Sequence, residues 1–278
     1  MKKHYDEVSL RSSKVVTNTY STSFSIGIRS LHHSLHDPIY AIYGFVRLSD
    51  EIVDSFIGYE QRQLLDELEQ DVFKAIEKGI SINPILHSFQ EVVNKYQIDH
   101  ELIRQFLQSM RMDLDETSHT LKSYQLYILG SAEVVGLMCL KVFCDGKNDQ
   151  YNELKPYAQK LGSAFQKVNF LRDFKADYQE LQRVYFPDLK MGEFDDSSKR
   201  GIEDEIEHEF KEALVGIEKL PRKARFGTYL AYRYYCELLK RIKKKRASAL
   251  MNERVRVPNG TKYYLFLVCA VKRMFGLI

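Results

Sequence analysis

The chain has 278 residues, of which 44% are hydrophobic and 28% are charged, and this composition excludes an intrinsically disordered protein. The formal net charge of +3 is too small to indicate a nucleic-acid-binding protein, and 14 glycines and 6 prolines are too few for the many turns of an all-β fold. We therefore expect a helical protein without a nucleic-acid partner.

Helix signals follow one another along the chain. The first begins with Asp37, a suitable N-cap residue, and Pro38 at the first helical position. Segments with apolar residues at helical spacing cover 36–56, 59–79 (ending at Gly79), 99–114, 121–143, 156–181 and 225–245. Residues 183–201 are typical of a loop, and no segment shows the alternation of a β-strand. The pattern predicts an all-α fold in a single domain, 1–278.

The segment 121–143 is largely apolar and contains small residues at Gly130, Ser131, Ala132 and Gly136. We expect it to form a central helix in close contact with its neighbours.

No apolar run is expected to span a membrane, since the longest, 263–271, has about half the required length. The N-terminus lacks the apolar region of a signal peptide. The four cysteines are interpreted as reduced core thiols, which favours a cytoplasmic protein.

Two pairs of aspartates four residues apart are the main candidate site. Asp50 and Asp54 lie in an apolar helix segment, where Arg47 shares their face and Tyr43 extends it by one turn. The second pair continues a polar stripe made of Gln166, Asn169, Asp173 and Asp177, with Arg172 beside it. Carboxylates at this spacing are about 6 Å apart along a helix. That spacing suits Mg²⁺ ions that share their remaining ligands with a phosphate-rich substrate.

The alternative is that both stripes are ordinary solvated helix faces. A single aspartate pair favours that interpretation, because surface helices carry such pairs routinely. The two pairs together weaken it, because each lies in an apolar helix near an arginine and neither has a lysine four residues on. Glu51 points about 100° away from Asp50 on the helical wheel, so we place it outside the direct ligands. From the residues alone, both interpretations stay open.

The same segments resemble the squalene and phytoene synthases. "YAIYGFVRLSDEIVD" (40–54) is similar to the first aspartate-rich segment of that family, and "LGSAFQKVNFLRDFKAD" (161–177) is similar to the second. "RVYFP" (183–187) resembles the segment that follows it, "STSF" (21–24) an N-terminal motif, and "SAEVVG" (131–136) a small-residue motif. The chain departs from the family's usual residues at Tyr20, Thr22 and Leu129, and these departures bear on the details of diphosphate binding.

The resemblance implies an isoprenoid-synthase-type helical bundle with a central cavity. It also implies a Mg²⁺-dependent prenyltransferase, with Mn²⁺ as a substitute, that condenses two allylic diphosphates head to head through a cyclopropylcarbinyl diphosphate. The metal ligands and catalytic residues would be Asp50, Asp54, Asp173 and Asp177. The substrate-binding residues would be Arg47, Arg172, Gln166, Asn169, Ser23, Phe24, Tyr43 and Tyr235.

Three functions remain open at this point. The first is phytoene synthase, which uses geranylgeranyl diphosphate, and it is slightly favoured because Ile28 leaves more room in a substrate tunnel than an aromatic residue would. The second is a squalene or dehydrosqualene synthase that uses farnesyl diphosphate. The third is a non-catalytic helical assembly factor, which would be free to lose the aspartates. The absence of a dinucleotide motif weakly disfavours NADPH.

The basic run 240–246 and the apolar C-terminus that follows it have two interpretations. They form either a solvated helix end with a packed terminal helix or a peripheral contact with the inner membrane. Arg254, in the segment between them, is a further candidate for phosphate binding.

Overall fold

The protein is built almost entirely of helices. The structure, a computed structural model, describes residues 2–20, 22–179, 183–187 and 194–276. The helices are α1 (Lys2–Tyr20), α2 (Thr22–Arg29), η1 (His33–Leu35), α3 (His36–Ser55), α4 (Gln61–Lys78), α5 (Pro84–Tyr96), α6 (His100–Asp115), α7 (Leu121–Ile128), η2 (Leu129–Glu133), α8 (Val134–Phe143), α9 (Asn148–Gln179), α10 (Asp196–Lys219), α11 (Arg222–Lys243), α12 (Ala247–Leu250) and α13 (Asn259–Met274). The described residues contain no β-strand, only an isolated bridge between Ser118 and Val184, so the all-α prediction is confirmed.

The structure departs from two predicted helix starts and from the predicted loop 183–201. α3 begins at His36, because the short helix η1 runs directly into it, so Asp37 lies in its first turn and is not the N-cap. α9 begins at Asn148, well before Pro156. Pro156 is exposed, so water can solvate the carbonyl that the proline leaves without a donor. α10 begins within the predicted loop, where the Asp195 carboxylate accepts hydrogen bonds from two backbone amides of its first turn.

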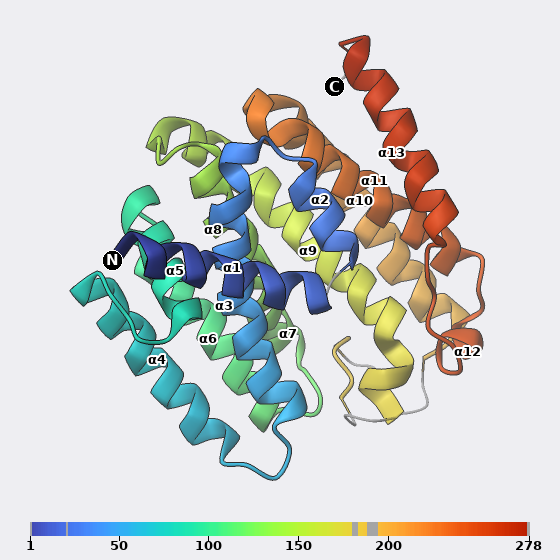
Figure 1. The fold of residues 1–278 in the computed structure, drawn as a ribbon. Coiled ribbons are helices and arrows are strands. Elements are labelled where there is room, and N and C mark those ends of the chain that lie inside the picture. Colours follow the sequence, from blue (N-terminus) through green and yellow to red (C-terminus); the bar gives the residue numbers. More distant parts are fainter. Residues whose placement is uncertain (1, 21, 180–182, 188–193, 277–278) are drawn as a thin grey trace.

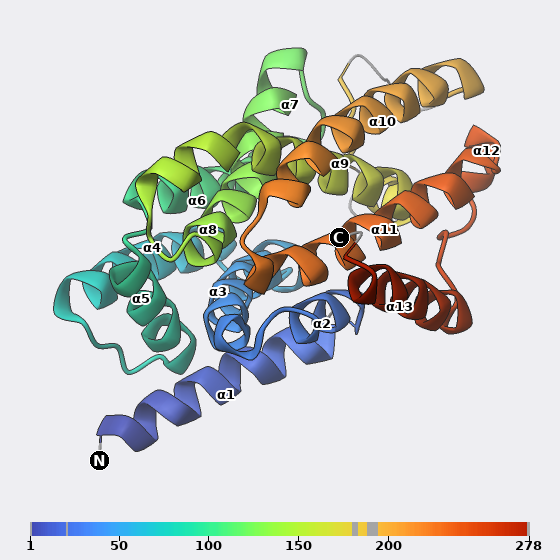
Figure 2. The ribbon, with the colours of Figure 1, turned by 90° about the horizontal axis from the view of Figure 1, so that it is seen from above.

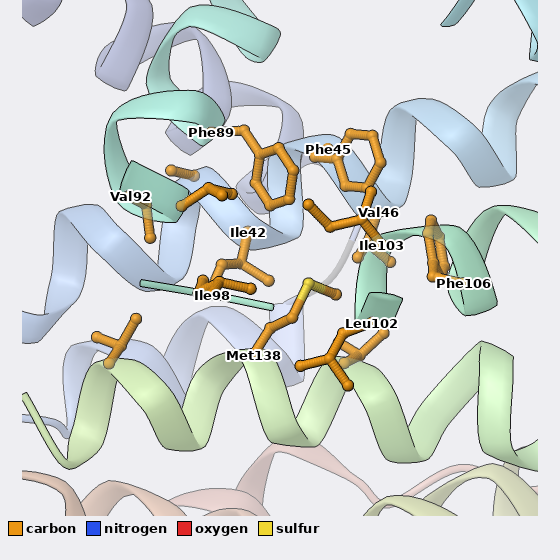
Figure 3. Packing of buried hydrophobic residues seen from close by; sticks show 14 of the residues in the cluster. Ile42, Phe45, Val46, Phe89, Val92, Ile98, Leu102, Ile103, Phe106 and Met138 are labelled. Carbon is orange, nitrogen blue, oxygen red and sulfur yellow. The ribbon is translucent and has the colours of Figure 1, made fainter. Parts of the chain in front are cut away.

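The largest hydrophobic core joins α3, α5, α6 and α8. Phe45 of α3 stacks on Phe89 of α5, with ring centroids 4.2 Å apart, and it also contacts Phe106 of α6. Figure 3 shows these rings beside Ile42 and Met138. A second core joins α9, α10, α11 and α12 with Tyr185 and Phe186. Helix α3 belongs to the first core, and α9 joins both, since Tyr151 and Leu154 lie in the first core while the part of α9 with the predicted aspartate stripe lies in the second.

The run α7–η2–α8 occupies the interior of the fold, as its small residues predicted. A Cβ at Gly130 would lie 2.5 Å from the Gln105 carbonyl of α6, so only glycine permits this close approach. The run Leu121–Phe143 is long and apolar enough to cross a membrane by length and composition, contrary to the expectation from its sequence. It packs against α3, α6 and α9, and half of its most apolar window is buried, as in the core helix of a globular fold.

Candidate active site

A cavity of about 990 Å³ lies between the two cores. This volume is at the upper end of the range of roughly 300–1,000 Å³ found for small-molecule pockets. Its walls come from α1, α2, α3, α6, α7, η2, α8, α9, α10 and α11, from Tyr185, and from residues 254–259 and Lys262 at the start of α13. The lining includes these predicted site residues: Phe24, Tyr43, Arg47, Asp50, Asp54, Gln166, Asn169, Arg172, Asp173, Asp177 and Tyr235. The structure thus brings segments more than a hundred residues apart to one cavity, and α3 and α9 both cross the middle of the molecule (Figure 1).

The aspartates of α3 carry negative charge that the protein only partly compensates. Burial in the cavity wall and repulsion from Asp54 raise the pKa of Asp50 from 3.8 to about 7. The nearest cation, Arg47, lies 3.7 Å away but makes its closer ion pair with Glu51. Glu51 does not line the cavity, which agrees with its predicted place outside the direct ligands.

The aspartates of α9 differ from each other in their surroundings. Asp173 is held by two arginines, since the Arg172 Nε donates to it at 3.0 Å and Arg254 lies 2.6 Å away. Asp177 has no ion-pair partner among the described residues, and burial together with repulsion from Asp173 and Asp54 raises its pKa to about 8. Arg183 lies between the two stripes, since its guanidinium is 3.2 Å from Asp54 and its backbone amide donates to the Asp177 carbonyl at 2.8 Å. Arg254 therefore joins the site, as its sequence position suggested.

A fifth aspartate, Asp113 of α6, was missed by the sequence analysis. It is 8% exposed, and its carboxylate accepts hydrogen bonds from the hydroxyls of Tyr127 at 2.8 Å and Tyr185 at 3.0 Å. Arg183 lies 3.7 Å from Asp113 and 3.2 Å from Asp54, so it links the buried carboxylate to the α3 stripe. Burial raises the pKa of Asp113 to about 6.

Asp113→Asn is expected to lower turnover with little loss of stability. The raised pKa of Asp113 means that burial disfavours its charge more than Arg183 favours it, and Arg183 keeps Asp54 as a counter-charge at 3.2 Å. Turnover should fall, because Arg183 then loses one of the two carboxylates that hold it in place beside the α3 stripe. Denaturant unfolding and steady-state assays measure both effects. Asp115→Asn on the same helix is the control, because Asp115 is exposed and its ion-pair partner in the described part of the chain is the exposed Arg62. Equal behaviour of the two variants would contradict this role for Asp113.

Aromatic rings form the wall beside the carboxylates. Phe24 of α2 and Tyr43 of α3 lie with ring centroids 3.7 Å apart, and Phe165 of α9 stacks on Tyr235 of α11 at 3.9 Å. The Tyr235 hydroxyl donates to the Asn169 side chain at 3.1 Å, which ties the aromatic wall to the polar stripe of α9. Such faces stabilise cations without offering a nucleophile. The side chain of Ser23, the remaining predicted site residue, lies outside the described part of the structure.

The donor set of the cavity suits a hard divalent cation. Its carboxylates come from two facing helices, and the raised pKa values of Asp50 and Asp177 show that negative charge gathers there without enough positive charge nearby. Oxygen ligands of this kind suit Mg²⁺ and Mn²⁺. Arg47 also has a buried Nε without a hydrogen-bond partner among the described residues, and this donor is free for an anionic ligand.

Asp177→Asn is expected to stabilise the metal-free protein at high pH. The pKa of Asp177 is about 8 in the folded state and 3.8 as the ordinary value, so between these pH values the folded state binds a proton that the unfolded state has released. Stability therefore falls as pH rises through this window. Because the side chain is partly exposed to the cavity, we expect a gain of only about 1 kcal/mol, or about 2–4 °C in Tm, near the upper end.

Thermal denaturation in EDTA across this pH range measures the effect. The gain should vanish near the lower end of the window, where Asp177 is protonated in both states. Asp149→Asn, at an exposed position of the same helix, should show no such pH dependence. Identical melting curves for wild type and Asp177→Asn at the upper end of the pH window would show that ionisation of Asp177 does not destabilise the folded protein.

A second group of metal-ligand types lies away from the cavity, at Asp6, His87 and Glu91. The His87 Nδ1 accepts a hydrogen bond from the Ser81 amide, so the Nε2 carries the proton and donates to Asp6 at 2.8 Å. Lys2 pairs with Asp6 at 2.9 Å. With the ring nitrogens engaged and a cation already present, this cluster joins α1 to α5 without a metal.

Comparison with known proteins agrees with this geometry. The squalene/phytoene synthase family matches residues 17–261. The chain is 28% identical over 200 residues to a 4,4'-diapophytoene synthase of Staphylococcus haemolyticus (strain JCSC1435), which covers 70% of this chain and 66% of the relative. It is 26% identical over 273 residues to a phytoene synthase of Arthrospira platensis, covering 89% and 87%. The fold matches a crystal structure of a dehydrosqualene synthase with a TM-score of 0.83 at 20% identity, over 98% of both chains.

Proposed function

Because the chain belongs to the squalene/phytoene synthase family, a family of prenyltransferases that use divalent metal, we propose that it is a phytoene synthase. It would join two geranylgeranyl diphosphates head to head into phytoene through a cyclopropylcarbinyl diphosphate. The observation that carries the proposal is the cavity in which facing aspartates with raised pKa values adjoin arginines and an aromatic wall. The whole chain, 1–278, would act as one domain.

Each part of the cavity has a role in this reaction. Asp50, Asp54, Asp173 and Asp177 would hold Mg²⁺, which as a Lewis acid neutralises charge on the departing diphosphate. Arg47, Arg172 and Arg254 would turn their guanidinium groups to the phosphate oxygens, whose geometry they match. Gln166 and Asn169 would add hydrogen bonds from the same stripe.

The apolar part of the cavity would hold the two prenyl chains and exclude water. The rings of Phe24, Tyr43, Phe165 and Tyr235 would face the carbocations that form once diphosphate departs. Cys139 also lines this region, and burial raises the pKa of its thiol to about 12, so it stays protonated and a poor nucleophile.

A squalene or dehydrosqualene synthase is the second candidate, because the relatives named above include a 4,4'-diapophytoene synthase and a dehydrosqualene synthase. The two candidates differ in substrate length and in any reductive step with NADPH, which we do not expect here. The third alternative, a non-catalytic assembly factor, is disfavoured because the four aspartates and both neighbouring arginines are all present and gather at one cavity. We propose a cytoplasmic enzyme at the inner membrane, with no nucleic-acid partner.

Product analysis tests the proposal. The purified protein is incubated with geranylgeranyl diphosphate or farnesyl diphosphate and Mg²⁺, with and without NADPH. We expect a forty-carbon hydrocarbon from the first substrate, whether or not NADPH is present. A clear preference for farnesyl diphosphate would replace phytoene synthase with the second candidate.

Ile28→Phe is expected to shift the substrate preference toward the shorter diphosphate. Ile28 of α2 is 2% exposed and lines the cavity, so a larger side chain there removes room for a prenyl tail. Overpacking an apolar site costs about 1–3 kcal/mol, so the ratio of kcat/KM for the two substrates should move by about ten-fold or more. The ratio is measured on one protein, so a general loss of stability cancels. An unchanged ratio would remove Ile28 from the residues that set chain length.

A further inference from the structure

Tyr20 is brought to the cavity by the packing of α1 on α3. The two helices lie against each other in Figures 1 and 2, and a Cβ at Gly44 of α3 would lie 2.6 Å from the Ser13 Oγ of α1. Ser9, Ser13 and Thr17 form the buried face of α1, and Tyr20 continues that face by one turn. The side chain of Tyr20 therefore lines the cavity at the end of α1, where it is 53% exposed.

The ring of Tyr20 lies against the guanidinium of Arg47, one turn beyond Gly44 on α3. The Arg47 Cζ is 4.2 Å from the ring centroid, within the range of a cation–π contact. The ring covers one face of the guanidinium, and the Arg47 side chain is only 25% exposed. Tyr20, at a position where the chain departs from the family, thus contacts an arginine of the proposed diphosphate site.

Glu51 holds the edge of the same guanidinium. The Arg47 Nη2 donates to the Glu51 carboxylate. Burial raises the pKa of Glu51, but side-chain hydrogen bonds from Ser55, Arg47 and Tyr20, together with the charge of Arg47, lower it below its ordinary value. Tyr20 therefore contacts Arg47 with its ring and Glu51 with its hydroxyl. We call Tyr20 and Glu51 the Arg47 clamp.

The Arg47 clamp keeps Arg47 away from a proposed metal ligand. The Arg47 Nη1 lies 3.7 Å from Asp50, while the Nη2 makes the closer ion pair with Glu51. Arg172 shows the other arrangement, since it pairs with Asp173, which is itself a proposed ligand. Arg172 must share or exchange that partner when metal binds. Because the Arg47 clamp contains no proposed ligand, it can stay in place with metal bound.

The Arg47 clamp also leaves donors for an anionic ligand. The Arg47 Nε is buried and has no hydrogen-bond partner among the described residues. A free arginine side chain loses much rotamer freedom when it binds, so a guanidinium that is already fixed binds a phosphate at a lower entropic cost. Tyr20 and Glu51 would thus contribute through the orientation of Arg47 and not through contacts of their own with the substrate.

We propose that Tyr20 and Glu51 are positioning residues that orient Arg47 toward the diphosphate group of the substrate and keep it off Asp50. The diphosphate role of Arg47 and the metal role of Asp50 rest on the proposed function. The alternative is that the Tyr20 ring only covers an arginine at the protein surface. A covering role predicts no change in ligand affinity, whereas positioning predicts weaker binding of diphosphate and metal by a folded protein.

Calorimetric titration of the full chain with inorganic pyrophosphate at saturating Mg²⁺ tests the role of Tyr20. Tyr20→Leu should bind pyrophosphate about three-fold more weakly than wild type, because it loses the cation–π contact. Tyr20→Phe keeps the ring and should recover most of the affinity. In an Arg47→Gln background, Tyr20→Leu should cause no further loss. Tyr59→Leu is the matched control, since Tyr59 is exposed and lies outside the cavity.

Thermal denaturation at increasing Mg²⁺ concentration tests the role of Glu51 without any diphosphate. Glu51→Gln removes the charge that holds Arg47, so Arg47 can pair with Asp50 and compete with the metal. We expect about three-fold more Mg²⁺ to be needed for the same rise in Tm. The loss should disappear in an Arg47→Gln background, where no arginine competes. Asp37→Asn, at an exposed position of the same helix, should respond to Mg²⁺ as wild type does.

The outcomes separate the clamp from the proposed function. Equal pyrophosphate affinity of wild type and Tyr20→Leu, a loss that persists without Arg47, or no recovery in Tyr20→Phe would each overturn the role of Tyr20. A weaker Mg²⁺ response of Glu51→Gln that persists without Arg47 would show that Glu51 acts by its charge alone. A wild type that binds neither Mg²⁺ nor pyrophosphate would overturn the proposed function, and the clamp with it.

Discussion

Asp50→Asn and Asp173→Asn are each expected to lower turnover at least about a thousand-fold. Asparagine keeps the shape of the side chain but removes the charge that would hold a metal against the diphosphate, and the loss corresponds to about 4 kcal/mol in the transition state. The fold should survive, because both side chains face the cavity and not a hydrophobic core. Steady-state kcat at ordinary Mg²⁺ concentration measures the effect, with circular dichroism to verify the fold.

Matched controls exist on the same two helices. Asp37 is exposed in the first turn of α3, and Asp149 is exposed in the first turn of α9, so Asp37→Asn and Asp149→Asn make the same chemical change outside the cavity. Both should keep wild-type turnover. A kcat close to wild type in Asp50→Asn or Asp173→Asn would mean that the metal site has been assigned to the wrong residues.

Removal of divalent metal is expected to abolish activity completely. The facing aspartates supply only oxygen ligands, so Mg²⁺ should restore turnover and Mn²⁺ should substitute for it. Metal binding can also be measured without substrate, because a cation that binds only the folded protein raises the Tm of that protein. Mg²⁺ should therefore raise the Tm of wild type, and more strongly at higher pH, where Asp50 and Asp177 release their protons more readily.

The double variant Asp50→Asn/Asp177→Asn is the control for this effect. It lacks the two carboxylates whose pKa values are raised by burial, so its Tm should not respond to Mg²⁺. Full activity after exhaustive EDTA treatment would contradict the assigned metal site. An equal rise in the Tm of wild type and of the double variant with Mg²⁺ would also contradict it, because the cation would then bind elsewhere.

Both aspartate stripes could be predicted because helix periodicity alone places their members on one face. Asp50 and Asp54, like Asp173 and Asp177, are four residues apart, and the structure turns both pairs into one cavity. Asp113 could not be found this way, because its role depends on Arg183, which lies seventy residues further along the chain. The signal that was available is the segment 183–187, which had been noted only for its resemblance.

Local chain chemistry accounts for the errors in the helix boundaries. Asp37 and Pro38 together are typical of a helix start, but the preceding helix η1 supplies the first turn and moves the start of α3 to His36. Pro156 was wrongly taken as the start of its helix. α9 begins earlier, at Asn148, because an exposed helix turn can tolerate a proline. The ion pairs of Lys243 with Glu207 and of Lys245 with Glu253 in the basic run depend on packing between segments. Sequence spacing does not reveal such packing.

The amount of diphosphate released per product tests the central claim most directly. The purified protein is given geranylgeranyl diphosphate and Mg²⁺, and pyrophosphate and prenyl products are measured together. Head-to-head condensation predicts two pyrophosphates for each hydrocarbon molecule, because both substrates lose their leaving group. One pyrophosphate for each prenyl alcohol, with no hydrocarbon, would show a hydrolase and contradict this account.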